Sequence, residues 1–311
     1  MVELAINLLK TARPRQWLKN LSLGAALLFS GKLFDFPSVI LTGWGVVIFC
    51  LLTSSIYFFN DIVDAPRDRL HPFKKFRPIA SGKLPIPVAI FFSLLGIFLS
   101  CYLAFGLSFF FFLTCLAYLI LQFFYTFYLK NIIILDVFSI AASFLLRVYA
   151  GAIILNYHLS IWFLLCVISL ALFMAVAKRR AELAMLTKET APSHRKTLSL
   201  YTEDLLDDYL SMFSASAWMS WALFTFFESQ PIVFGSPALH AILPLTFSGT
   251  NKLLMITVPV VIYGIMRYLS LIYQGSKAES PERLLLSDKP LLGSVILWGF
   301  LVILILYGGR D

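Results

Sequence analysis

The chain has 311 residues and a formal net charge of +8; 59% of its residues are hydrophobic and only 14% are charged. Soluble domains carry roughly 25% charged residues, so this composition excludes both a water-soluble globular protein and a disordered chain. The apolar residues fall into blocks of about 20, long enough for a helix to cross a bilayer. Unbroken apolar stretches such as 109–124 also exclude an outer-membrane barrel, whose strands alternate apolar and polar residues. The expected fold class is an all-α, polytopic membrane protein.

Apolar blocks bounded by charged residues, Gly or Pro predict nine membrane-spanning helices. They cover residues 20–35, 39–60, 86–105, 107–128, 132–155, 160–178, 210–228, 253–274 and 291–308. We interpret the first block as a span and not as a removed signal peptide, because no convincing cleavage site follows it. The four cysteines lie inside apolar blocks without metal-type spacing and are expected to be packing residues.

Lys and Arg residues gather in the cytoplasmic loops of membrane proteins. With nine spans, most of the 25 Lys and Arg residues fall on the side that holds the N-terminus and the loops 61–85 and 178–209. This predicts a multi-pass protein of the cell inner membrane with its N-terminus and active site in the cytoplasm and its C-terminus outside. The asymmetry accounts for the net charge, so nucleic-acid binding is not required.

The organisation expected from these spans is one membrane domain over residues 1–311, with nine helices around a cavity that opens to the cytoplasm. The two long loops lie four spans apart and are predicted to deliver polar residues to that cavity. The sequence is compatible with a homo-oligomer and specifies no partner protein.

The second predicted span ends in a stripe of carboxylates. Asp61, Asp64 and Asp68 are three and four positions apart, so they share one helix face. Three carboxylates on one face repel one another unless cations bridge them, and oxygen ligands completed by a bound diphosphate are typical of Mg²⁺. Pro66 removes an intrahelical donor, so we expect Asp68 to lie off the ideal stripe. The alternative is a solvated helix end at the membrane surface.

A run of cations follows the stripe, over residues 69–82. Arg69, Lys74 and Arg77 are the candidates for binding a polyphosphate substrate, because Arg and Lys donors orient the phosphate charge that a metal leaves uncompensated. The alternative is anchoring of the loop to anionic lipid.

Three further polar residues lie in or next to the fifth predicted span. Arg147 lies eleven residues after Asp136, which returns it to within about 20° of the same helix face, about 16 Å along the axis. A guanidinium inside a membrane usually faces a polar cavity, so we interpret Arg147 as a site residue; the alternative is a structural pair with an acidic or carbonyl group. Lys130 and Asp136 flank the start of this span and are expected to line the cavity.

These motifs resemble the UbiA-type intramembrane prenyltransferase superfamily, whose NDxxDxxxD hallmark matches Asn60, Asp61, Asp64 and Asp68. Further segments look like its decaprenyl-phosphate phosphoribosyltransferase branch: 13–20, 68–80, 129–147, 178–183, 267–269 and 281–288. The resemblance implies transfer of a 5-phosphoribosyl group from phosphoribosyl diphosphate to a polyprenyl phosphate, with release of diphosphate. It also implies Mg²⁺ as cofactor.

One departure from the wider superfamily bears on the chemistry. Members that use a prenyl diphosphate typically carry a second Asp-rich motif after the sixth span, where this chain has Lys178, Arg179, Arg180 and the single acid Glu182. Cations suit an acceptor that is already a phosphate anion, and such an acceptor needs no general base. The alternative is again anchoring of the loop to the membrane.

The resulting site prediction has two groups. The catalytic and metal-binding residues are expected to be Asn60, Asp61, Asp64 and Asp68. The substrate-binding residues are expected to be Lys19, Asn20, Arg69, Lys74, Arg77, Lys130, Asp136, Arg147, Lys178, Arg179 and Glu182. Two rivals stay open: a prenyltransferase that joins a prenyl diphosphate to an aromatic acceptor, against which the missing motif counts, and a transporter, against which the short, charge-poor external loops count.

Overall fold

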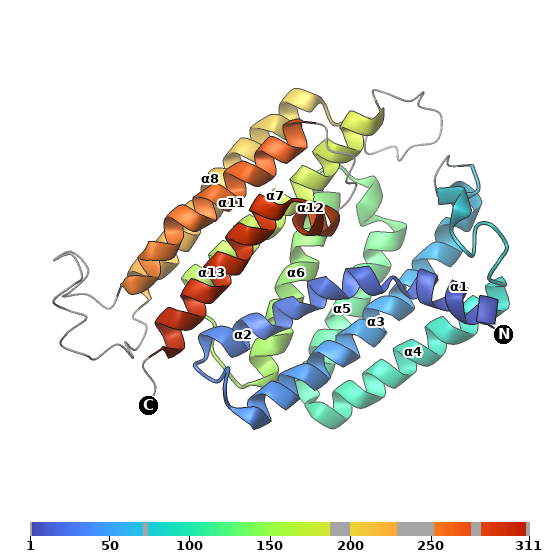
Figure 1. The fold of residues 1–311 in the computed structure, drawn as a ribbon. Helices are drawn as coiled ribbons and strands as arrows, with labels where there is room; N and C mark the ends of the chain where they lie inside the picture. The colour runs from blue at the N-terminus through green and yellow to red at the C-terminus, as the bar shows by residue number, and fades with distance from the viewer. Residues whose placement is uncertain (1, 71–73, 187–199, 229–251, 275–280, 309–311) are drawn as a thin grey trace. The chain divides into compact units, whose positions relative to one another are not determined.

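The structure is a computed structural model that describes residues 2–70, 74–186, 200–228, 252–274 and 281–308. Over these residues the chain consists of helices and their connections, without a strand (Figure 1). The chain divides into two compact units. Unit 1 comprises Met1–Leu27, Lys32–Tyr157 and Glu189–Tyr201, and unit 2 comprises Leu28–Gly31, His158–Lys188 and Thr202–Asp311. The description of the chain as one membrane domain remains a prediction.

Unit 1 contains the N-terminal helices and the first four long helices. Its elements are α1 (Val2–Ala12), the 3-10 helix η1 (Pro14–Leu23), α3 (Phe36–Asp68), η2 (Lys74–Phe76), α4 (Ile86–Leu107), α5 (Phe109–Phe127), η3 (Leu129–Asn131) and α6 (Leu135–Ile154). Helix α3 packs against α4, α5, α6, α1 and η1, so it is the central element of the unit. The short helix α2 (Gly24–Phe29) carries the chain from unit 1 into unit 2.

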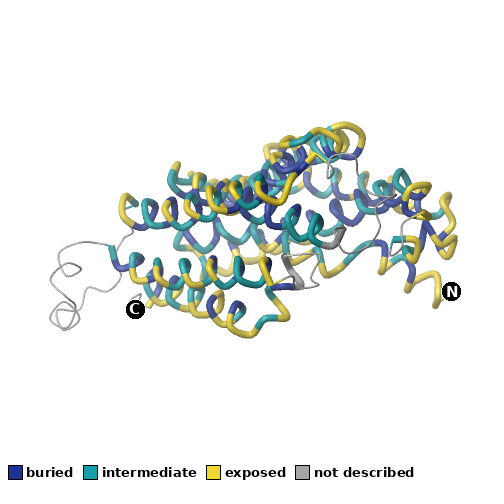
Figure 2. The backbone as a smooth tube through the Cα atoms, turned by 90° about the horizontal axis from the view of Figure 1, so that it is seen from above, coloured by how far each residue is buried: buried dark blue, intermediate teal, exposed yellow. Residues whose placement is uncertain are grey.

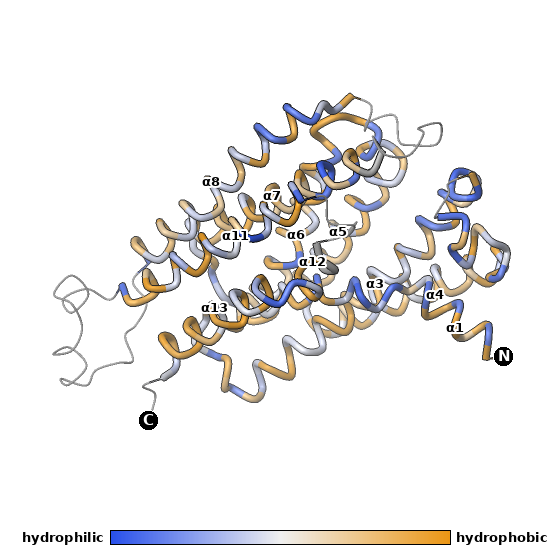
Figure 3. The backbone as a smooth tube through the Cα atoms, turned by 45° about the horizontal axis from the view of Figure 1, so that its top comes forward, coloured by the Kyte–Doolittle hydropathy of each residue, from blue (hydrophilic) through white to orange (hydrophobic). Residues whose placement is uncertain are grey.

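Unit 2 contains the remaining long helices. Its elements are α7 (Ile161–Leu186), α8 (Glu203–Phe227), η5 (Leu253–Thr257), α11 (Val258–Tyr273), α12 (Pro281–Ser287) and α13 (Lys289–Tyr307). Helix α7 packs on α8, and α11 packs on both and on α13. In Figure 3 the long helices are hydrophobic over most of their length, whereas the start of α8 and the connection that follows α3 are hydrophilic.

Eight helices among the described residues are long and apolar enough to cross a membrane. They correspond to the second to ninth predicted spans, which confirms a polytopic membrane protein. The first predicted span, 20–35, is instead divided between η1 and the six-residue α2. The apolar run of this segment covers only residues 21–29, because Lys19 and Asn20 precede it and Gly31 (φ 74°) and Lys32 follow it. The total of nine spans, the cytoplasm-facing cavity and the sidedness remain predictions.

Helix α3 is long enough for its polar C-terminal end to extend out of the hydrocarbon core. The Asp35 carboxylate caps its start by accepting from the hydroxyl (2.5 Å) and the backbone N–H (3.1 Å) of Ser38, and these bonds lower the pKa of Asp35. The 33 residues of α3 cover about 50 Å, against about 30 Å for the apolar core of a bilayer. Its last turns, which carry the carboxylates, therefore have room beyond the core.

Exposed apolar side chains mark the faces that meet lipid. Along α4, Phe91, Leu94, Phe98 and Tyr102 are each more than 60% exposed and follow the helical repeat, whereas small residues on the opposite side of α4 are buried. Figure 2 shows exposed and buried residues alternating along the helices. Such a surface is stable only against acyl chains. All four cysteines are free and either buried or half-buried, which agrees with the expected packing role.

Small residues permit the close helix approaches in unit 1, as is common within membranes. A Cβ on Gly151 of α6 would lie 2.0 Å from the backbone oxygen of Leu23 in η1, and a Cβ on Gly96 of α4 would lie 2.0 Å from the Ser55 hydroxyl of α3. Ser93 donates to the Ser55 carbonyl across the second interface (2.9 Å). The helices approach closely because glycine has no side chain at the contact, so η1 packs on α6 through backbone atoms.

We expect Gly151→Ala to destabilise the protein by about 1–3 kcal/mol, because the new methyl group meets the backbone of Leu23, which cannot rotate away. Thermal unfolding in detergent measures this change. Gly43→Ala on α3 is the matched control, since a Cβ at Gly43 meets nothing within 4 Å. An unchanged unfolding temperature for Gly151→Ala would show that η1 does not pack this closely on α6.

Aromatic packing and an ion pair between α11 and the start of α13 stabilise unit 2. Phe29, Phe163 and Phe224 pack in tilted and edge-to-face arrangements with centroids 4.9–5.4 Å apart. Arg267 of α11 donates from Nε (3.1 Å) and Nη2 (2.7 Å) to the two oxygens of Asp288, which also caps α13. The hydrogen bond from Arg267 lowers the pKa of Asp288. This geometry agrees with a structural role for both residues.

Candidate active site

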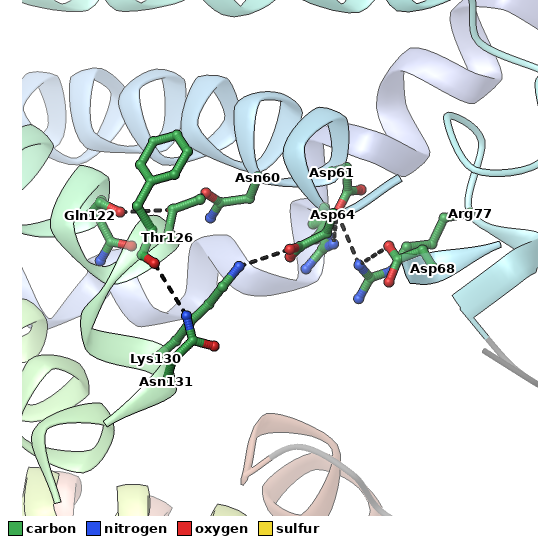
Figure 4. Close-up of polar contacts among 11 residues, drawn as sticks. Asn60, Asp61, Asp64, Asp68, Arg77, Gln122, Thr126, Lys130 and Asn131 are labelled. Atoms are coloured by element: carbon green, nitrogen blue, oxygen red, sulfur yellow. Dashed lines mark hydrogen bonds and ion pairs between the residues drawn. The ribbon is translucent and has the colours of Figure 1, made fainter. Parts of the chain in front are cut away.

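The carboxylate stripe at the end of α3 forms as the spacing predicts. Asp61 and Asp68 are buried and Asp64 is half-buried, and all three belong to one continuous helix that passes through Pro66 (Figure 4). The expectation that Pro66 moves Asp68 off the stripe is wrong. Seven residues complete almost two helical turns, and the Arg77 guanidinium bridges Asp61 and Asp68 directly.

Each carboxylate of the stripe is paired with a cation from another element. Arg77, which follows η2, donates from Nη1 to Asp61 Oδ1 (3.1 Å) and to Asp68 Oδ2 (2.7 Å). Lys130 of η3 donates from Nζ to Asp64 Oδ1 at 2.8 Å (Figure 4). Buried charges are stable only when they are paired, so these cations make the stripe possible without a ligand.

Arg13 is a site residue that the sequence analysis missed. Its Nη2 donates to Asp61 Oδ1 at 2.5 Å, and its guanidinium lies over the Tyr57 ring, 4.8 Å from the centroid. The left-handed backbone between α1 and η1 carries this side chain. The sequence analysis noted segment 13–20 because it resembles the family. Only the packing of α1 and η1 on α3 brings Arg13 to Asp61.

Asn60 begins the stripe and is fixed by a neighbouring helix. The Thr126 hydroxyl of α5 donates to Asn60 Oδ1 at 2.5 Å (Figure 4). Lys130 follows four residues later and is only 5% exposed. Helix α5 and η3 therefore fix the positions of two groups, the Asn60 amide at the start of the stripe and the Lys130 ammonium that contacts Asp64.

Arg147 and Asn20 contact each other and none of the three carboxylates. Arg147 donates from Nε to Asn20 Oδ1 (2.9 Å), from Nη1 to the carbonyl of Ser143 (2.9 Å) and from Nη2 to the Tyr118 hydroxyl (2.6 Å). It is 3% exposed and lies over the Tyr118 ring. All three guanidinium nitrogens thus donate to η1, α5 and α6, an arrangement that favours a structural role over direct substrate binding.

The other predicted cations of unit 1 are Arg69, Lys19 and Lys74. Arg69 is exposed and donates to the Ala80 carbonyl (3.3 Å), which stabilises the connection after α3. Lys19 in η1 and Lys74 in η2 are half-buried. Asp136, at 1% exposure, accepts from the Tyr201 hydroxyl (2.8 Å), a partner that the sequence analysis did not identify.

The basic end of α7 belongs to unit 2. Arg179 is 1% exposed and pairs with Glu182, and Lys178 Nζ is 4.0 Å from the same carboxylate. Arg180 donates to Asp207 (2.7 Å) and to Glu203 (2.9 Å), acids at the start of α8 that the sequence analysis did not weigh. Of the three basic side chains, that of Lys178 is the most exposed, at 34%.

The donor set of the stripe is chemically suited to Mg²⁺. Carboxylate and amide oxygens are hard ligands, and Asn60, Asp61, Asp64 and Asp68 supply them from one helix end. Among the described residues no three acidic, His or Cys side chains are close enough to hold a metal by themselves. Mg²⁺ characteristically takes one or two carboxylates and completes its shell with substrate phosphates and water. The residues therefore fit a metal that is shared with a diphosphate.

The fold and the stripe together define a polytopic helical membrane protein with an acidic and basic site at the end of its longest helix. Residues 21–287 match the UbiA prenyltransferase family. The chain belongs to this family, as the resemblance of its motifs suggested.

Two curated relatives illustrate the position of the chain in the family. It is 33% identical over 309 residues to a decaprenyl-phosphate phosphoribosyltransferase of Corynebacterium glutamicum, covering 98% of this chain and 88% of the relative. It is 33% identical over 305 residues to the protein of the same name in Mycolicibacterium smegmatis, covering 95% and 91%. The similarity extends over nearly the full length of both proteins.

Solved structures share the fold. A UbiA homolog from Archaeoglobus fulgidus bound to GPP and Mg²⁺ superposes with a TM-score of 0.68 at 20% identity, covering 96% of this chain and all of that chain. At this identity the similarity establishes the helical architecture alone. The substrate has to be inferred from the chemistry of the site.

Proposed function

We propose that the protein transfers the 5-phosphoribosyl group of phosphoribosyl diphosphate to a polyprenyl phosphate and releases diphosphate. The observation that carries this proposal is the stripe at the end of α3, where three carboxylates are interleaved with Arg13, Arg77 and Lys130. Such a site offers ligands to a metal and donors to phosphate oxygens at once. The full-length similarity to proteins named decaprenyl-phosphate phosphoribosyltransferase supports the choice of sugar donor and acceptor.

The donor substrate would bind at the stripe. Asp61 and Asp64, assisted by Asn60 and Asp68, would hold Mg²⁺. When bound, the ion supplies positive charge that neutralises the charge of the diphosphate. Arg77 and Lys130 would donate to the phosphate oxygens. Arg69 and Lys74 would be further cations of the connection that follows α3, and Asp136, six positions after Lys130, would be a further site residue. Charge-assisted hydrogen bonds of this kind orient the leaving group.

The transfer itself requires no proton abstraction. An oxygen of the lipid phosphate attacks the anomeric carbon of the ribose, and the bond from that carbon to the diphosphate breaks with its electron pair leaving on the diphosphate. The attacking oxygen is already anionic, so no general base is needed. The site residues thus bind and orient charge, and the positive character that develops on the ribose is balanced by the departing and arriving anions.

For the acceptor phosphate we propose Lys178, assisted by Arg179 and Glu182. Lys178 carries the most exposed of the basic side chains at the end of α7, and an ammonium suits a phosphate monoester that is bound as a point charge. Glu182 would hold Arg179 and Lys178 in place. We further propose that the protein is in the cell inner membrane with this chemistry on the cytoplasmic side, as the distribution of Lys and Arg predicts.

Lys178→Met should raise the KM for polyprenyl phosphate about fivefold, the loss expected for one partly exposed cation, and leave the KM for phosphoribosyl diphosphate unchanged. Initial rates against each substrate measure both constants. Lys289→Met removes the same charge from an exposed position at the start of α13 and should change neither KM. Equal behaviour of the two variants would place the acceptor phosphate elsewhere.

A direct assay tests the activity. The purified full-length protein is incubated with Mg²⁺, labelled phosphoribosyl diphosphate and polyprenyl phosphate, and the expected result is a labelled lipid with one diphosphate released per transfer. A parallel reaction supplies a prenyl diphosphate and an aromatic acid. Prenylation of the acid without formation of the labelled lipid would contradict the proposal and favour the rival prenyltransferase.

A further inference from the structure

The connection between η3 and α6 contains a strained turn. Leu135 N donates to the Ile133 carbonyl at 2.8 Å, and the residue between them, Ile134, has φ 71° and ψ −48°. This is a γ-turn with positive φ at its centre, a rare conformation for any residue and an outlier for a β-branched one. Strain of this kind persists only where surrounding contacts enforce it, and it is concentrated at functional sites.

Tyr201 enforces this turn through its hydroxyl. The Ile134 N–H donates to the Tyr201 hydroxyl (2.8 Å), which in turn donates to Asp136 Oδ1 (2.8 Å). Tyr201 is 4% exposed and Asp136 is 1% exposed, so the contact is buried. Ile134 provides no side-chain cap for α6, and the Tyr201 hydroxyl accepts one of the amides that a helix start leaves unpaired.

The turn is connected at short range to Lys130. Asp136 N donates to the Ile132 carbonyl (3.1 Å), and Ile132 N donates to the Leu129 carbonyl (3.2 Å), so a chain of backbone bonds runs from α6 into η3. Lys130 lies in η3, is 5% exposed, and reaches Asp64 at 2.8 Å. A long side chain held this tightly depends on the position of its backbone, since a shift of η3 would move the ammonium away from the stripe.

We propose that Tyr201 is a positioning residue that holds the strained Ile134 turn and thereby presents Lys130 at the carboxylate stripe. Tyr201 acts through Asp136 and the backbone of the turn. The kinetic part of this inference rests on the proposed phosphoribosyl transfer, whereas its structural part is independent of the reaction.

Tyr201→Phe should raise the KM for phosphoribosyl diphosphate about tenfold, because removal of one hydroxyl releases the turn while the ring still fills its space. Combining it with Ile134→Gly should restore the KM to within about threefold of the wild-type value, since glycine adopts positive φ without a steric penalty. Tyr102→Phe, at an exposed position on α4, is the matched control and should behave as wild type. The proposal would be overturned if the double variant Tyr201→Phe, Ile134→Gly kept the raised KM while it unfolded at the same temperature as wild type.

A second measurement does not depend on turnover. Reductive methylation followed by mass spectrometry should label Lys130 several-fold faster in Tyr201→Phe than in wild type, with exposed Lys75 as the internal reference. Equal labelling of Lys130 in both proteins would overturn the positioning role. If wild type makes no ribosyl lipid but Lys130 labelling rises in Tyr201→Phe, the proposed function fails and the positioning role stands.

Discussion

Asp61→Asn should lower kcat/KM for phosphoribosyl transfer about 1,000-fold and raise the Mg²⁺ concentration needed for half-maximal rate. Asp61 is the carboxylate that two guanidinium groups, those of Arg13 and Arg77, approach at one oxygen. The amide keeps the shape and one oxygen acceptor, so the helix end should remain folded, but the negative charge that would hold a metal is lost. Initial rates over a Mg²⁺ titration, together with thermal unfolding, measure the effect.

Asp35→Asn is the matched control for this prediction. It removes one carboxylate from the opposite end of the same helix, where asparagine caps about as well as aspartate, so activity and stability should both stay near wild type. Full activity of Asp61→Asn at the Mg²⁺ concentration used for wild type would refute the metal-binding role of the stripe.

Arg77→Met should raise the KM for phosphoribosyl diphosphate about 100-fold with a smaller effect on kcat. Arg77 makes two charge-assisted hydrogen bonds, to Asp61 and Asp68, and in the proposed complex it would donate to the diphosphate. An increase of about 100-fold in KM corresponds to a loss of about 2.7 kcal/mol of binding free energy, which is the contribution of one or two such bonds. Arg77→Lys should recover only part of it, because an ammonium cannot form the same planar fork.

Lys75→Met separates this effect from general charge. Lys75 is exposed and lies two residues from Arg77, so its replacement makes the same change in net charge in the same connection. We expect its KM to stay within about twofold of the wild-type value, as is usual for an exposed surface charge. An equal increase in KM for both variants would mean that the connection acts through its overall charge and that Arg77 has no specific role.

Local periodicity predicted the stripe well. The three-and-four spacing of Asp61, Asp64 and Asp68 places them on one face whatever surrounds the helix, because the helical repeat is a property of the backbone. The expectation that Pro66 displaces Asp68 was wrong, because a proline can be accommodated when neighbouring contacts hold the helix, and the local rule ignores those contacts.

Partners distant in sequence were not predictable in this way. Arg13 is 48 residues from Asp61, Lys130 is 66 from Asp64, and Arg147 is 127 from Asn20. The sequence analysis grouped Arg147 with the substrate-binding cations because a charge in a span is costly. It had no information on the neutral acceptors in η1, α5 and α6 that satisfy this guanidinium.

The amino-acid sequence by itself determined that this protein is a polytopic helical membrane protein of the UbiA family and that a carboxylate stripe ends its longest helix. Hydrophobic length and helical spacing are sufficient for the membrane helices and the stripe, because both are local, whereas the family followed from the resemblance of the motifs. Only the tertiary structure decided which cation meets which carboxylate and that Tyr201 holds the turn before α6. Those pairs depend on how separate helices pack, and helix packing is set by side-chain shape across interfaces that no single segment contains.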